Sequence, residues 1–170
     1  MVAGTAVLQL KQLAISRTDL FYVRKCMSAT PTTEGDMVEV YSLVNDAEHI
    51  RKVQRATLKT TDYGLVPEHG LFGTADWWEA IRSGQLPIIR IEGVISRVRM
   101  GNMNDWPVFE IDASGCKTTW PREVHRSEDD RLYTVGKRVC LEYVIQNAKK
   151  DLANFGTTRQ QVILRIVVER

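Results

Sequence analysis

Residues 86–100 carry the pattern that decides the fold, and they read Leu-Pro-Ile-Ile-Arg-Ile-Glu-Gly-Val-Ile-Ser-Arg-Val-Arg-Met. Ile89 and Ile91 alternate with charged residues, which is typical of a β-strand with one buried face. Beyond Gly93 the apolar set moves by one position, to Val94, Val98 and Met100. Because a slip of one residue turns the other face of a strand inward, we expect a β-bulge or a sharp bend at Gly93.

Four further strands are predicted downstream of this one, at residues 106–111, 116–120, 137–146 and 161–169. Each shows the strand period or is rich in β-branched and aromatic residues. A long bent strand, a meander and two more strands fit a small closed or half-closed antiparallel barrel. The oligonucleotide- and oligosaccharide-binding (OB) barrel and the SH3-like barrel are two such shapes.

The sequence upstream of residue 86 has a mixed pattern. Two strand-like stretches, 20–23 and 37–44, flank a loop rich in Thr, Pro and Gly, and they predict a hairpin. An amphipathic helix is predicted over residues 46–58, with Asn45 as its N-cap. A second short helix is predicted over residues 74–84, where Trp77 and Trp78 supply the apolar side chains.

Together these patterns predict an α+β chain that is mainly antiparallel β. We expect a small C-terminal five-stranded barrel, OB-like or SH3-like, with an N-terminal hairpin and two short helices. The expected boundary lies after residue 85. Residues 1–85 would form an N-terminal α+β segment that packs on the barrel, and residues 86–170 would form the small β-barrel.

The composition is that of an ordinary globular domain and excludes several other classes. The chain has 170 residues, of which 44% are hydrophobic and 26% charged, with a net charge of +2. This is too apolar for a disordered chain and too nearly neutral for a strong field aimed at nucleic acid or an anionic membrane. The charge is uneven, at −1 for residues 1–85 and +3 for residues 86–170.

The cysteines and the N-terminus predict a cytoplasmic protein with no membrane partner. Cys26, Cys116 and Cys140 lie far apart without a CxxC pair, which argues against a disulfide scaffold and against a cysteine-rich zinc site. No signal-peptide core or membrane span is evident.

Basic and aromatic residues in the barrel half suggest a surface for single-stranded nucleic acid. Arginine and lysine would neutralise phosphates while bases stack on tryptophan rings. The candidate residues are Arg97, Arg99, Trp106, Lys117, Trp120 and Arg122. The alternative is that the basic residues solvate an outer face, near Glu92, Glu110 and Asp112, while the tryptophans close the core.

The loop between the first two barrel strands adds Asn102, Asn104 and Asp105 to the candidate ligand-binding residues. Loops at this position often contribute to binding in OB-like barrels. Asn and Asp are also the residues that a tight turn prefers, so turn chemistry is the alternative.

Evidence for catalysis is weak. Cys116, Glu123 and His125 are a conceivable nucleophile and general-base group, but no catalytic motif surrounds them. The three histidines have no spacing that suits a zinc site. We therefore expect no catalytic residue, no metal and no cofactor.

The last strand is apolar on both faces, from Val162 to Val168. Such a strand is either central in its sheet or an edge strand that pairs with another chain. The second possibility predicts a homodimer. The leading hypothesis is a non-catalytic binding module acting through a protein partner or self-association. The alternatives are weak single-stranded nucleic-acid binding on the barrel face and a small enzyme with a Cys116/His125 site.

Overall fold

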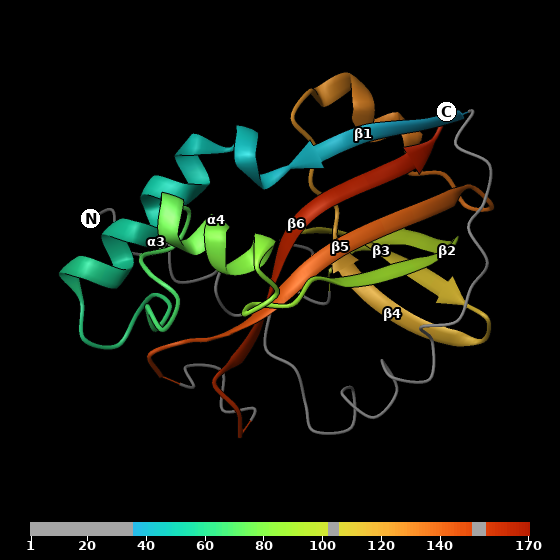
Figure 1. Cartoon of the computed structure of the whole chain (residues 1–170). Coiled ribbons are helices and arrows are strands. Elements are labelled where there is room, and N and C mark those ends of the chain that lie inside the picture. The colour runs from blue at the N-terminus through green and yellow to red at the C-terminus, as the bar shows by residue number, and fades with distance from the viewer. Residues whose placement is uncertain (1–35, 102–105, 151–155) are drawn as a thin grey trace. The chain divides into compact units, whose positions relative to one another are not determined.

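A computed structural model describes residues 36–101, 106–150 and 156–170, and Figure 1 shows the arrangement of the elements. In chain order they are β1 (Met37–Ser42), the 3₁₀ turn η2 (Leu43–Asn45), α3 (Ala47–Lys59), α4 (Ala75–Arg82), β2 (Ile89–Met100), β3 (Pro107–Ala113), β4 (Cys116–Pro121), the 3₁₀ turn η3 (Ser127–Leu132), β5 (Arg138–Asn147) and β6 (Arg159–Glu169).

The fold class is confirmed: the chain is α+β, mainly antiparallel sheet with a few short helices. The strands form one six-stranded sheet in the order β1-β6-β5-β2-β3-β4. Strand β1 pairs antiparallel with β6, β2 with β3, and β3 with β4.

The sheet differs from the expected five-stranded barrel in two respects, because it has a sixth strand and is not closed. The sixth strand is β1, which pairs with β6 from Met37↔Glu169 to Ser42↔Arg165. A closed barrel needs its two end strands to pair, and the alternation within each strand says nothing about that long-range pairing.

The last strand is internal, since β6 lies between β1 and β5. Residues such as Leu164, Ile166 and Val168 are buried within the chain. Of the two alternatives for a two-sided apolar strand, the central position is the one observed. The feature that suggested self-association is thus accounted for without a second chain.

The N-terminal elements follow the sequence closely where they are described. The stretch 37–44 forms β1 and the start of η2, whereas its expected hairpin partner, residues 20–23, lies outside the described residues. Helix α3 begins one residue later than expected. Its N-cap is Asp46 rather than Asn45, and the Oδ1 atom of Asp46 accepts the His49 N–H at 2.9 Å.

The expected slip at Gly93 is wrong in its position. The register with β3 shifts between Ile95 and Arg97, and Ile91 and Ile95, on either side of Gly93, are both buried. Val94 and Met100 are 40% and 41% exposed as a result. Gly93 serves close packing instead, because a Cβ there would overlap the Asp112 carbonyl oxygen of β3.

The described residues divide into two compact units. One contains residues 43–89, 143–150 and 156–163, with a core that includes Leu43, Phe72, Trp77 and Tyr143. The other contains residues 36–42, 90–101, 106–142 and 164–170, with a core that includes Ile95, Phe109, Trp120, Leu141 and Ile166. The expected division into 1–85 and 86–170 stays a prediction. No helix among the described residues is long and apolar enough to cross a membrane.

Candidate functional site

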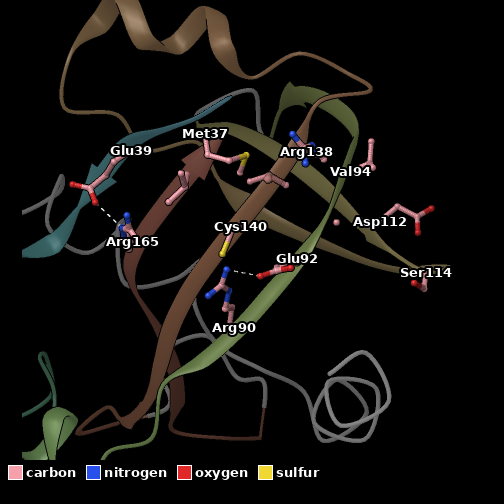
Figure 2. Close-up of a pocket in the computed structure, with 13 residues that line it drawn as sticks. Met37, Glu39, Arg90, Glu92, Val94, Asp112, Ser114, Arg138, Cys140 and Arg165 are labelled. Carbon is pink, nitrogen blue, oxygen red and sulfur yellow. Dashed lines mark hydrogen bonds and ion pairs between the residues drawn. The ribbon is translucent and has the colours of Figure 1, made fainter. Parts of the chain in front are cut away.

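The second unit contains a cavity of about 630 Å³ on one face of the sheet, which we call the sheet-face cavity (Figure 2). Strands β1, β2, β3, β5 and β6 all contribute side chains to it, together with the turn after β3. The lining residues are Met37, Glu39, Arg90, Glu92, Gly93, Val94, Asp112, Ser114, Arg138, Val139, Cys140, Arg165 and Val167.

Strand alternation places the charged residues of this cavity. In β2, Arg90 and Glu92 flank the buried Ile91, and in β6, Arg165 lies between the buried Leu164 and Ile166. Since successive side chains of a strand point to opposite faces, the core residues on one face direct the charges to the other.

Each of the three arginines that line the cavity forms an ion pair with a glutamate. Arg165 Nε lies 2.6 Å from Glu39 Oε2, across the β6–β1 pair, and Arg90 Nη2 lies 2.5 Å from Glu92 Oε1. Arg138 Nη2 lies 2.9 Å from Oε1 of Glu169, which lies just outside the cavity lining. Exposed pairs of this kind add little stability, about 0–1 kcal/mol each, but they fix the direction of long side chains.

The cavity offers no reactive thiol. Cys140 lies in its lining, and burial raises the pKa of this thiol, an effect that the nearby Arg90 charge opposes but does not cancel. A thiol with a raised pKa is protonated at neutral pH and is a poor nucleophile. Apolar side chains such as Met37, Val94 and Val167 beside fixed charges suit binding rather than catalysis.

The basic and aromatic residues named from the sequence lie elsewhere in the same unit. Arg97 is exposed on β2, and the Nη1 atom of Arg99 donates to the Met100 carbonyl oxygen at 3.1 Å. Lys117 Nζ lies 3.7 Å from Glu110 Oε1, and Arg122 Nε lies 2.8 Å from Asp130 Oδ1.

The two tryptophans of that group differ in exposure. Trp106 is half-buried, whereas Trp120 is only 1% exposed and its Nε1 donates to Thr118 Oγ1 at 2.9 Å. The Trp120 ring is therefore a core side chain with no exposed face for a base. Asn102, Asn104 and Asp105 lie outside the described residues. The assignment of these residues as a ligand-binding site stays a prediction.

The fold does not bring Cys116 and His125, the residues of the enzyme hypothesis, close together. Cys116 begins β4 and pairs with Ala113, whereas His125 follows the far end of the same strand. A strand of this length spans about 17 Å. His125 instead borders β1: the Ser42 N–H donates to its Nε2 at 3.0 Å, and its ring stacks on Tyr41 at 5.1 Å between centroids.

Metal chemistry finds no support in the part of the chain that the structure describes. No group of three or more His, Cys, Asp or Glu residues there could hold a metal ion.

Sequence reasoning missed the cavity, although part of its signal was visible. Arg90 and Glu92 alternate with isoleucines, which marks a polar strand face. The sequence does not reveal the strand order, which brings Glu39 beside Arg165, 126 residues away. That neighbourhood depends on the pairing of β1 with β6.

Comparison with known proteins adds one family. No curated protein matches the chain. The family model described as immunity protein RhsI2 matches residues 37–169, which include every strand of the sheet and all residues that line the sheet-face cavity. The match covers well over half of the 170 residues, and the chain belongs to the RhsI2 immunity protein family.

Proposed function

We propose that this protein is a non-catalytic binding module that acts through a protein partner, and that the partner is a toxin which the chain neutralises by binding. The observation that carries this proposal is the family match over residues 37–169, because an immunity protein protects a cell against a toxin. The two other hypotheses, a nucleic-acid-binding barrel face and a small enzyme, gain no support from the family.

The sheet-face cavity is the surface we propose for the toxin. Interfaces between proteins combine an apolar centre with a polar rim, and arginine is enriched at their energetic centres. Met37, Val94 and Val167 supply apolar surface, and the three arginines surround it. Because each arginine is already oriented by a carboxylate, docking would cost less side-chain entropy than with free arginines.

The partner is a different protein rather than a second copy of this chain. Both hydrogen-bonding edges of β6 are paired within the sheet, by β1 and β5, so this strand leaves no open edge for a second copy. For the compartment we retain the cytoplasm as a proposal. The three cysteines are few and lie far apart in the sequence without a CxxC pair, which suits a reducing compartment.

The test is biolayer interferometry with an immobilised toxin domain of the kind that RhsI2-family proteins give immunity against. We expect wild-type protein to bind it, and Arg90→Ala/Arg165→Ala to weaken binding by about tenfold or more, the size of a hot-spot effect. Arg97→Ala is the matched control, because Arg97 is exposed on the same strand as Arg90 but outside the cavity lining. Wild-type protein that is folded and does not bind the toxin domain contradicts the proposal.

A further inference from the structure

Helix α3 presents a strongly basic exposed face that the site above does not use. Its 13 residues include one exposed carboxylate, Glu48, and four exposed cations. These cations are Arg51, Lys52, Arg55 and Lys59. Lys52 is paired with Glu48 at 2.7 Å. Arg51, Arg55 and Lys59 follow at intervals of four, so they form one row along the helix, which we call the α3 basic row.

The packing of the helix fixes the direction of this row. Val53 and Thr57, on the opposite side, are 8% and 5% exposed. The Thr57 hydroxyl accepts the Leu65 N–H at 3.1 Å and so ties this side to the following segment. Because one side of α3 is held in the core of its unit, the α3 basic row is held toward solvent.

No ion pair or side-chain hydrogen bond is found for Arg51, Arg55 or Lys59 within residues 36–101, 106–150 and 156–170. Capping of the helix does not require Lys59 either. The Nζ atom of Lys149 donates to the Thr57 carbonyl oxygen and, at 2.8 Å, to that of Thr60, so another lysine already neutralises the negative end of the helix dipole. Within these described residues, the charge of the α3 basic row is therefore not compensated by any ion pair.

An exposed leucine lies beside the α3 basic row. Leu58 is 71% exposed, the highest exposure among the large hydrophobic side chains of the described residues. It follows Arg55 by three positions and Arg51 by seven, which places it on the same side of the helix. Burying this leucine against a partner would remove apolar area from water, while the neighbouring arginines, a residue type enriched at interface hot spots, find partners.

We propose that the α3 basic row and Leu58 bind an acidic surface of the toxin, with Leu58 packing into it. This inference rests on the proposed function and adds the charge of the partner. Charge complementarity is the argument: unpaired cations at one helix face attract a surface rich in Asp and Glu, and they accelerate encounter.

Two other occupants fit α3 less well. Nucleic-acid sites combine basic residues with exposed aromatic rings, but the exposed face of α3 has none, since His49 is half-buried against Phe72. Helices that lie on membranes insert a broad apolar face, whereas the less polar side of α3, which carries Val53 and Thr57, is buried in the core of its unit.

The test measures association and dissociation rates against the same immobilised toxin domain at about 20 mM and about 300 mM NaCl. The variant Arg51→Glu/Arg55→Glu should slow association about tenfold at low salt, and high salt should shrink the difference. Leu58→Ser should speed dissociation several-fold. The control Arg82→Glu/Arg159→Glu makes the same charge change at exposed positions of the same unit and should leave both rates near wild type.

The outcomes separate the two proposals. If wild-type protein binds and Arg51→Glu/Arg55→Glu associates at the wild-type rate, the α3 inference is overturned and the toxin-binding function stands. If wild-type protein does not bind the toxin domain, both are overturned. If the row instead determines binding to phosphatidylglycerol vesicles or to a single-stranded RNA oligomer, and not to the toxin domain, the acidic protein surface is the wrong occupant.

Discussion

Gln146 is a buried amide whose two polar atoms both have partners. Its Oε1 accepts the Trp77 Nε1–H at 2.9 Å, and its Nε2 donates to the Val66 carbonyl oxygen at 2.9 Å. With Gln146 only 3% exposed, water cannot replace either bond. The sequence named Trp77 and Trp78 together as the apolar side chains of their helix, but the hydrogen-bond partner of Trp77 lies 69 positions away and follows only from the fold.

We expect Trp77→Phe to lower the free energy of unfolding by about 2–4 kcal/mol, because it leaves the Gln146 Oε1 unsatisfied and a space unfilled. Urea unfolding followed by circular dichroism measures this. Trp78→Phe is the matched control, since Trp78 is half-buried and no hydrogen bond of its indole is found among the described residues; its cost should be about 1 kcal/mol or less. Equal losses in the two variants would contradict the role of the buried bond.

Glu169 gives a pH-dependent prediction. Its carboxylate accepts the Arg138 backbone N–H and the Arg138 Nε–H, both at 3.0 Å, and these bonds hold the pKa of Glu169 below its ordinary value of 4.5. A lowered folded-state pKa means that the stabilisation is present above the unfolded-state pKa. It is lost as the pH falls through the lower, folded-state value.

The urea midpoint of wild-type protein should therefore exceed that of Glu169→Gln at pH 7. The gap should close progressively as the pH falls below about 4.5. A gap of constant size from neutral to acid pH would show that the carboxylate charge is not what stabilises this contact.

At the scale of elements, local patterns were sufficient for most boundaries. The expected helix over residues 46–58 is α3 at Ala47–Lys59, and the expected strand over 137–146 is β5 at Arg138–Asn147. These elements carry their own periodicity and caps. The polar stretch 121–130 contains the start of η3. The site of the irregularity in β2 was wrong, because a glycine required by close packing looks in sequence like a glycine required by a bulge.

Gly93→Ala tests that explanation of β2. The added Cβ would overlap the Asp112 carbonyl oxygen and lie 2.8 Å from Ile111 Cγ2, so backbone must move. We expect a loss of about 2 kcal/mol or more, read as a lower thermal midpoint. Val94→Ala, at the neighbouring and 40% exposed position, should cost less than about 1 kcal/mol. An unchanged thermal midpoint for Gly93→Ala would contradict a role of Gly93 in close packing and would favour a role in bending the strand.

For the whole molecule, the sequence predicted the class but not the topology or the site. The six-stranded order places β1 beside β6, which opens the expected barrel and brings Glu39 to Arg165. The pairing of β1 with β6 and the ion pair of Glu39 with Arg165 both join residues more than 120 positions apart, and no local sequence pattern encodes either contact. The expectation of a protein partner came from missing catalytic motifs, a near-neutral charge and a last strand that is apolar on both faces. The position of β6 inside the sheet explains that strand within the chain, and membership of an immunity protein family supports the protein partner.

Growth of toxin-expressing cells shows directly whether this protein neutralises a toxin. Cells that express the same toxin domain used for the binding measurements are grown with and without this protein. We expect wild-type protein and Arg97→Ala to restore growth, whereas Arg90→Ala/Arg165→Ala, at the same level of folded protein, should protect poorly. Continued growth arrest in the presence of abundant, folded wild-type protein would contradict neutralisation of the toxin.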